Sequence, residues 1–265
     1  MACFPAITLS PRSMKVLKDM DDLAGIGHRQ FIDEVPNLIP GWLHDFTAVS
    51  TALMLERQES AEIRGPLLEI GVYAGRYFSL LIRSAARNGD DAWGLDTFQY
   101  VDEEAVLTHH LARLVGRAPI HMIADFSISF TSAELLARMA ARPRFISIDG
   151  SHERDDVFWD LRIAEELLAA EGIVAVDDFI NPLTLGVNDA VNAFFATPRI
   201  LAPFAYVQNK LFLCRPVRAQ VERMVLEDAI ETSAEARAAQ WRKDRSQDRK
   251  LVEALMWGHQ FTLVS

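Results

Sequence analysis

The chain has 265 residues, of which 50% are hydrophobic and 24% charged, a balance typical of a globular protein with room for one large core. Its formal net charge of −10 argues against nucleic acid as a main partner, because phosphate binding needs clustered lysine and arginine. No apolar run reaches the roughly 18–20 residues that cross a bilayer, so no membrane partner is expected.

The cysteines and the first residues bear on the compartment. Cys3 and Cys214 are the only cysteines, which excludes a disulfide framework and a thiolate zinc site and suits a reducing cytoplasm. Met1–Ser10 lacks a basic region followed by a long apolar stretch, so no secretory signal is expected. The predicted localisation is therefore cytoplasmic.

The first 65 residues form an extension before the main pattern begins. Residues 1–40 are predicted to be irregular, because prolines interrupt them at positions 5, 11, 36 and 40. Residues 42–59 have apolar side chains at helical spacing, which predicts a helix. Packing of this helix on the core is the simpler interpretation, and a cover over a site is the alternative.

The main pattern begins with a strand, a glycine-containing turn and a helix. Residues 66–70 are predicted as the strand and residues 76–87 as the helix, with Glu69, Gly71 and Gly75 around the turn. Such a turn lets a ligand approach backbone N–H groups at the start of the helix. The spacing differs from the Gly-x-Gly-x-x-Gly pattern of dinucleotide binders.

The next elements continue the alternation of strands and helices. A second strand, residues 92–95, ends at Asp96, which is placed to accept hydrogen bonds from ribose hydroxyls or to cap the next helix. Asp90 and Asp91 before it are interpreted as a solvated turn. A helix over 103–114, a strand over 120–123 that ends near Asp125, and a helix over 132–141 are predicted to follow.

Two further strands each end in acidic residues. Phe145–Ile148 stops at Asp149, and Ile173–Val176 stops at Asp177 and Asp178, with a predicted helix over 153–170 between them. In a parallel strand–helix–strand unit these carboxylates converge on one rim, together with His152. A divalent cation that prefers oxygen ligands would offset their repulsion.

The last part of the chain changes character. After a predicted helix over 187–195, residues 201–208 and 211–215 flank Asn209-Lys210, which predicts an antiparallel hairpin. From Val217 onward the sequence is charged and predicted to be helical, and residues 261–264 are a candidate short strand.

This layout resembles the class I S-adenosylmethionine-dependent methyltransferases. The motifs are residues 68–75, residues 94–98, and residues 148–153 together with 176–179. They are similar to the group that contains the macrocin and mycinamicin O-methyltransferases and the cephalosporin-hydroxylase-like proteins. The resemblance implies an α/β fold with a Rossmann-like seven-stranded sheet, mostly parallel with a C-terminal antiparallel β-hairpin, and helices on both faces.

The resemblance also implies the binding residues. In that superfamily the first motif holds the methionine end of S-adenosylmethionine, the acid that closes the second strand holds the ribose, and residues after the third strand flank the adenine. The residues at the matching positions are Glu69, Gly71, Tyr73, Gly75, Asp96, Thr97 and Asp125, with Asp149 beside them.

In metal-dependent relatives, acids after the fourth and fifth strands hold magnesium. These positions are Asp149, Asp177 and Asp178 here, and Asp149 and His152 are the predicted catalytic residues. A histidine with an ordinary pKa of about 6.5 suits a general base, whereas hydrogen bonding to a carboxylate at a helix N-terminus is its structural alternative.

The predicted organisation is an N-terminal extension and cover helix (1–65), a methyltransferase domain (66–216) and a C-terminal helical segment (217–265). The predicted function is Mg²⁺-dependent O-methylation of a small molecule, with a sugar or another diol as the class of acceptor. A non-catalytic S-adenosylmethionine-binding protein and a nicotinamide-dependent oxidoreductase are the alternatives. A homo-oligomer stays open, because the charged C-terminal helices offer a contact surface.

Overall fold

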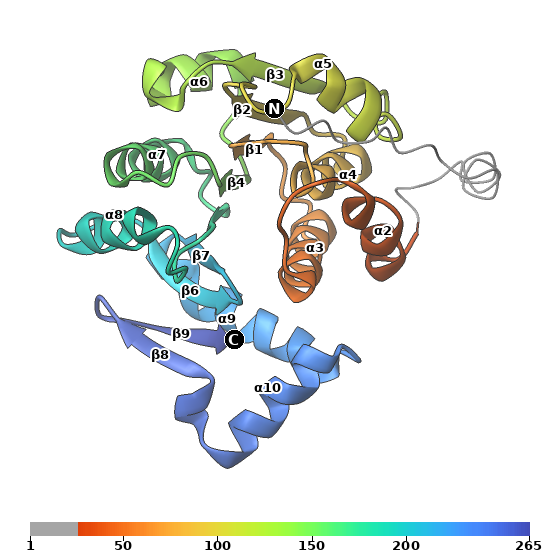
Figure 1. Ribbon diagram of the computed structural model, residues 1–265. Coiled ribbons are helices and arrows are strands. Elements are labelled where there is room, and N and C mark those ends of the chain that lie inside the picture. The colour runs from red at the N-terminus through yellow and green to blue at the C-terminus, as the bar shows by residue number, and fades with distance from the viewer. Residues whose placement is uncertain (1–25) are drawn as a thin grey trace.

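The computed structural model describes residues 26–265, in which one sheet separates two layers of helices (Figure 1). The strand order is β3-β2-β1-β4-β5-β7-β6-β9-β8. The strands are β1 Leu67–Ile70, β2 Ala92–Asp96, β3 Ile120–Ala124, β4 Phe145–Ile148, β5 Ile173–Val176, β6 Ala202–Val207, β7 Lys210–Cys214, β8 Glu253–Met256 and β9 His259–Val264.

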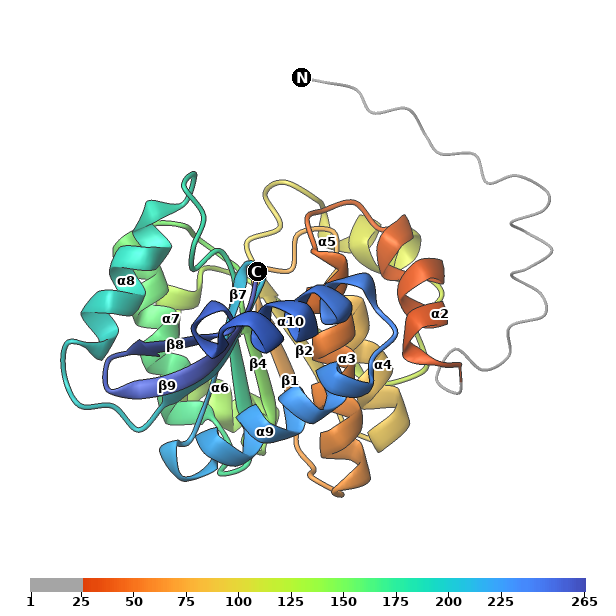
Figure 2. The same cartoon turned by 90° about the horizontal axis from the view of Figure 1, so that it is seen from below.

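The first five strands are parallel, and β7 enters antiparallel between β5 and β6. Helices α6, α7 and α8 cover one face of the sheet, while α3, α4 and α9 cover the other, as the view from below shows (Figure 2). The α-helices are α2 His28–Glu34, α3 Asp45–Ser60, α4 Phe78–Asn88, α5 Glu103–Ala105, α6 Ser132–Met139, α7 Arg154–Leu167, α8 Leu185–Phe195, α9 Pro216–Thr232 and α10 Ala236–Gln247.

The central strands are buried on both faces, which explains why they read as continuous apolar runs. Successive side chains of a strand point to opposite faces, so Phe145 and Ile173 pack toward α3 and α4, whereas Ile146 and Val174 pack toward α7. The strands β4 and β5 have the predicted bounds. Each is a short apolar run that is buried on both faces of the sheet, and the acidic residue that follows it marks where the buried strand ends.

The prediction of seven strands is wrong, since the sheet formed by residues 26–265 has nine. The predicted short strand at 261–264 is confirmed as β9, which runs parallel to β6. Its partner β8 lies in a stretch predicted to be helical. Strand β8 has little apolar alternation of its own and forms because β9 offers it an edge.

Two other predictions fail locally. Residues 28–38, predicted to be irregular, form α2 and the 3₁₀ turn η1 (Pro36–Leu38). The helix predicted over 103–114 ends at His110 after the single π-turn η2 (Val106–His110), where the Leu111 N–H reaches back to Val106. The short 3₁₀ turns η3 (Ser127–Ser129) and η4 (Arg249–Leu251) complete the elements.

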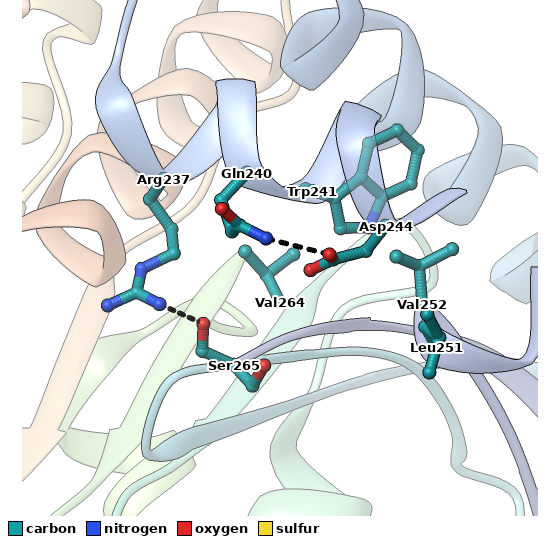
Figure 3. A pocket seen from close by; sticks show the side chains of 8 residues that line it. All are labelled: Arg237, Gln240, Trp241, Asp244, Leu251, Val252, Val264 and Ser265. Carbon is teal, nitrogen blue, oxygen red and sulfur yellow. Dashed lines mark hydrogen bonds between the residues drawn. The ribbon is translucent and has the colours of Figure 1, made fainter. Parts of the chain in front are cut away.

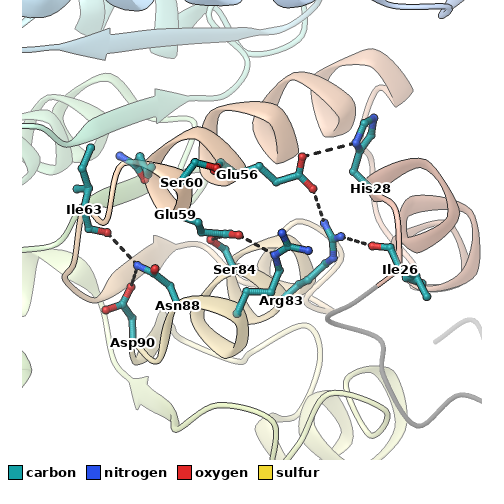
Figure 4. Close-up of polar contacts among 12 residues, drawn as sticks. Ile26, His28, Glu56, Glu59, Ser60, Ile63, Arg83, Ser84, Asn88 and Asp90 are labelled. Carbon is teal, nitrogen blue, oxygen red and sulfur yellow. Dashed lines mark hydrogen bonds and ion pairs between the residues drawn. The ribbon is translucent and has the colours of Figure 1, made fainter.

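A buried polar network fixes the N-terminal helices to the sheet. Ser84 donates to Glu59, and Asn88 donates both to the Ile63 carbonyl and to Asp90 (Figure 4). The carboxylate of Asp90 also pairs with the fully buried guanidinium of Arg144 at 2.8 Å. The interpretation of Asp90 as part of a solvated turn is therefore wrong, because a partner distant in sequence makes its burial favourable.

Among the described residues, no helix is both long and apolar enough to cross a bilayer. Cys3, Met1–Ser10 and the first two prolines lie outside the described residues. Cys214 is a buried free thiol on β7, and burial raises its pKa to about 12.

Candidate active site

The carboxyl ends of β2, β1, β4 and β5 form one rim, and backbone hydrogen bonds fix its shape. The Gly71 N–H donates to the Leu95 carbonyl, and the Asp149 N–H donates to the Ile70 carbonyl, each at 2.8 Å. The Asp177 N–H donates to the Ile148 carbonyl at 2.9 Å. The rim lies where the order of the strands reverses, between β1 and β4, which is where open α/β sheets bind ligands.

The turn after β1 depends on glycine. Gly71 has a φ of +87°, and a β-carbon there would lie 2.1 Å from the carbonyl oxygen of Asp149. Gly75 has the same φ, and a β-carbon there would lie 3.0 Å from the side chain of Leu111. The turn therefore brings the backbone of β1 against that of β4, and only glycine allows this contact at position 71.

Asp96 organises this turn. One of its oxygens accepts the N–H groups of Val72 and Tyr73, at 2.7 and 2.8 Å, and the other accepts that of Phe98 at 2.8 Å. A carboxylate has about four acceptor positions, so room is left for a hydroxyl of a ligand. Asp96 thus links the ends of β1 and β2, whereas the sequence predicted it as a ribose contact or as a cap of the next helix.

Three predicted cofactor residues lie along the same rim. Tyr73 is on the β1 turn, where it is partly exposed at a φ of +49°. Thr97 follows β2, and Asp125 follows β3 and accepts hydrogen bonds from the Phe126 N–H and the Ser129 hydroxyl. The structure therefore brings the predicted cofactor residues to one edge of the sheet.

Asp149, His152 and Asp178 lie together at the end of β4 and β5. Each offers one ligand atom, and the three atoms lie within 4.8 Å of one another, a spacing that suits a metal ion. His152 Nε2 lies 3.1 Å from Asp178 Oδ2. A β-carbon on Gly186 would lie 2.3 Å from the His152 carbonyl oxygen, so the start of α8 packs closely against this loop.

Asp178 is held by more than His152. Its Oδ1 accepts hydrogen bonds from the side-chain amides of Asn181 and Asn209. Burial would raise the pKa of Asp178, but these donors and His152 outweigh it and lower the pKa to about 2. In turn, the hydrogen bond to Asp178 raises the pKa of His152 above its usual value.

Asp177 lines the same cavity as Asp149 and His152 and has a further partner behind the rim. Its Oδ2 lies 3.2 Å from the ammonium of Lys210, which is fully buried and lies 4.0 Å over the ring of Tyr77. Burial would lower the pKa of Lys210, but Asp177, Asp149 and Glu69 raise it above its usual value. Asp177 therefore lies between Asp149, whose pKa it raises, and the lysine.

Glu69, buried behind the rim, and Asp149, half-buried on it, behave differently from exposed acids. Burial raises the pKa of Asp149 well above its usual value, and the nearby Asp177 adds to the effect. Burial also raises the pKa of Glu69, although Lys210 opposes this. A cation at the rim would favour the charged form of Asp149.

Sequence reasoning missed Asn181, Asn209 and Lys210. The last two were interpreted only as the turn between β6 and β7, and the pattern gave no sign of a role because turns rich in asparagine and lysine are common. Antiparallel insertion of β7 beside β5 brings this turn to the ends of the parallel strands.

Two small cavities differ in chemistry. One is lined by residues around the rim: Ile148, Asp149, Gly150, Ser151, His152, Val157, Val176, Asp177 and Val187. The other lies beneath α10, where Arg237 contacts the Ser265 carbonyl and Gln240 contacts Asp244 (Figure 3). The side chains that line the second cavity include no histidine or cysteine, and we place the site at the rim.

One buried acid below the rim allows the effect of burial on a carboxyl pKa to be tested. Asp160 on α7 is buried, and burial raises its pKa to about 7, with Ser127 opposing the shift. Since the unfolded chain ionises near pH 4, this group should lower stability as the pH rises from about 4 to 7. We expect Asp160→Asn to gain about 3 kcal/mol in free energy of unfolding relative to the parent between these pH values.

Urea unfolding of both proteins at pH 4.5 and pH 8 measures this difference. The exposed Asp155 on the same helix is the control, and Asp155→Asn should show little change with pH. A difference between Asp160→Asn and the parent that stays constant over this range would contradict the raised pKa.

Part of the chain that includes this rim matches a known protein family. Residues 68–179 match the protein family described as "Methyltransferase domain". Residues 68–179 of this chain are therefore similar to a methyltransferase domain. The matched segment begins on β1 and ends at the residue after Asp177 and Asp178, so it includes the ends of β1, β2, β4 and β5. The prediction of a methyltransferase is therefore confirmed.

Solved structures similar to this chain are O-methyltransferases. The O-methyltransferase NovP is 15% identical, with a TM-score of 0.55 over 77% of this chain and 99% of its own. The O-methyltransferase from Bacillus cereus, solved with SAH, is 14% identical, with a TM-score of 0.50 over 76% and 95%. The methyltransferase CalS11 is 18% identical, with a TM-score of 0.48 over 78% and 96%.

At these identities the similarity to NovP and the Bacillus cereus protein shows the fold, and it confirms the Rossmann-like architecture of the methyltransferase domain. No curated protein sequence matches this chain.

Proposed function

We propose that this protein is an S-adenosylmethionine-dependent O-methyltransferase that acts on a small molecule with neighbouring hydroxyl groups. The observation that carries the proposal is the convergence of Asp149, His152 and Asp178 beside the Gly71 turn. The turn offers a close approach to backbone, and the three side chains offer the groups that a hydroxyl acceptor needs. The solved O-methyltransferases with this fold support the same class of reaction.

The residues present fit both absent groups. The Gly71 turn packs the end of β1 against the end of β4 at the rim, and Asp96 retains acceptor capacity for a ribose hydroxyl. Asp149 and Asp178 offer carboxylate oxygens, which a hard divalent cation prefers over the imidazole of His152. In this proposal the carboxylates hold the ion and the histidine is left for proton transfer.

The protein contributes position and proton removal. S-adenosylmethionine supplies an electrophilic methyl group, and a divalent cation supplies a charge that lowers the pKa of a bound hydroxyl. The Gly71 turn and Asp96 orient the donor at one side of the rim. The acceptor hydroxyl loses its proton to His152 Nδ1, a nitrogen that has no hydrogen-bond partner among residues 26–265, while Asp178 stabilises the resulting imidazolium.

The acceptor would enter over exposed apolar side chains. Trp42 and Tyr73 are exposed beside the Gly71 turn, with 6.2 Å between their ring centroids, and Tyr100 is exposed in the segment after β2. Ile180 and Leu183 are exposed on the loop after β5. Phe46 and Phe179, two aromatic residues of the same segments, are buried in the core.

Calorimetric titration of S-adenosylhomocysteine into the protein is the decisive test, and we expect micromolar binding. Transfer of labelled methyl groups to a panel of sugars and other diols should then fall at least about tenfold when EDTA removes the metal, while binding of S-adenosylhomocysteine persists. Absence of binding would refute the proposal. Full methyl transfer in the presence of EDTA would refute only the proposed role of the metal ion. A non-catalytic role is not favoured, because a protein without chemistry has little use for this set of groups.

A further inference from the structure

The tip of the C-terminal hairpin packs against α8. Two residues, Trp257 and Gly258, connect β8 to β9, and their φ values of +52° and +79° fit the tight turn that joins antiparallel strands. The indole ring of Trp257 stacks on Phe195 of α8, with 4.5 Å between ring centroids and 16° between their planes. The hairpin lies outside the segment that matches the methyltransferase domain, so its role has to be found in its contacts.

The same indole contacts the residue that follows the two acids at the end of β5. Phe179 comes directly after Asp177 and Asp178, and its side chain is buried. Its ring contacts that of Trp257, with 5.7 Å between centroids, and that of Tyr206 on β6, with 6.1 Å between centroids. Rings from distant parts of the sequence therefore hold the side chain at the end of the acid-pair loop, which we define as Asp177–Phe179.

A line of hydrogen bonds leads from Trp257 to the backbone of the same residue. Trp257 Nε1 donates to Asn192 Oδ1 at 3.2 Å, and Asn192 Nδ2 donates to Asn188 Oδ1 at 3.0 Å. Asn188 Nδ2 donates in turn to the Phe179 carbonyl at 3.1 Å. Each amide accepts through its oxygen and donates through its nitrogen, so the members of the line fix one another's orientation.

We propose that Trp257 is a positioning residue that holds the acid-pair loop in the geometry that a divalent cation at the rim requires. The inference rests on the proposed function, because it concerns the ion that the rim carboxylates would hold. Trp257 contacts the ring of Phe179 directly and its carbonyl through α8, so loss of the indole removes two restraints on the loop together.

The first test is calorimetric titration of Mg²⁺ into the full chain saturated with S-adenosylhomocysteine. Trp257→Ala should weaken binding of the ion about tenfold or more, the usual effect of removing a group that orients metal ligands. Trp257→Phe keeps a ring against Phe179 and Phe195, and it should restore the affinity to within about threefold of the parent. Unchanged affinity in Trp257→Ala would overturn the inference.

Trp241→Ala is the matched control. Trp241 is another buried tryptophan of the C-terminal segment, and the guanidinium of Arg245 lies 5.1 Å from the centre of its ring. It belongs to the hydrophobic cluster on the α3 side of the sheet, whereas Trp257 and Phe179 belong to that on the α7 side. Its replacement should lower the free energy of unfolding and leave the affinity for the ion within about twofold of the parent. An equal loss of affinity in both alanine variants would indicate a general loss of stability and would overturn the inference.

Hydrogen exchange of the full chain without metal gives a second measurement. The N–H groups of Asp177 and Phe179 donate to the carbonyls of Ile148 and Asn209, so their exchange reports opening of the acid-pair loop. In Trp257→Ala this exchange should be at least about tenfold faster, while exchange at the Gly71 turn stays unchanged. Faster exchange confined to β8, β9 and α8 would show a merely local role and overturn the inference.

Asn192→Ala tests the inference if Trp257→Ala does not fold. This variant keeps the indole and breaks the line of hydrogen bonds to the Phe179 carbonyl. Exchange in the acid-pair loop should then be about threefold faster or more. Exchange at the rate of the parent would overturn the inference.

The outcomes separate this inference from the proposed function. Equal ion binding by the parent and by Trp257→Ala would overturn the inference and leave the proposed function intact. No ion binding by the parent would overturn both the inference and the metal part of the proposed function. If ion binding weakens in Trp257→Ala as expected but no diol accepts a methyl group, the proposed transfer is refuted and the inference stands.

Discussion

Replacement of His152 by alanine should lower kcat about 10²–10⁴-fold, the usual contribution of a positioned base. The parent should gain activity as the pH rises through the pKa of His152, because only the neutral imidazole accepts a proton. Asp178 raises that pKa, so the rise should lie above the ordinary value of about 6.5. The alanine variant should lose this rise, and a pH profile of kcat measures it.

The control for this prediction is His121→Ala. His121 lies on β3, where it pairs with Asp91 at 3.1 Å and stacks on Trp93, away from the rim. That variant should keep both activity and the pH profile. Binding of S-adenosylhomocysteine should be unchanged in both variants, since neither histidine belongs to the proposed cofactor site. Activity of His152→Ala near that of the parent would remove the proposed base.

The second large effect is expected at Gly71. An alanine β-carbon would lie 2.1 Å from the Asp149 carbonyl oxygen, and backbone atoms on both sides cannot move independently. The φ of +87° adds strain for any residue with a β-carbon. We expect Gly71→Ala to lose about 3 kcal/mol in free energy of unfolding and to weaken binding of S-adenosylhomocysteine at least about tenfold.

Gly116 separates the two causes. Its φ is +82°, but a β-carbon there would meet nothing within 4 Å. Gly116→Ala should therefore lose only the part due to φ, about 1 kcal/mol, and should bind the cofactor product normally. Urea unfolding and calorimetry on both variants measure these values. Equal losses at the two glycines would show that the close approach of β1 to β4 carries no cost of its own.

The sequence predicted the elements whose pattern is local. Phe145–Ile148 and Ile173–Val176 have the predicted bounds, since a short apolar run ending in acid admits few alternatives once both faces of a parallel sheet are buried. The turn after β1 was also predictable, because the spacing of Glu69, Gly71 and Gly75 along the chain is local information. Parallel strands bring their carboxyl ends together, so the meeting of Asp149, His152 and Asp178 followed from the order of the elements.

Contacts between segments distant in sequence decided the rest. Residues 253–256 became a strand because β9 offered an edge, a partnership that no local pattern encodes. Asp90 is buried because Arg144 meets it, and Asp177 faces Lys210 because β7 inserts antiparallel beside β5. The sequence by itself determined which chemical groups stand at the ends of the strands. Only the tertiary structure decided which charge each group faces, since electrostatic pairing depends on distance in space and not along the chain.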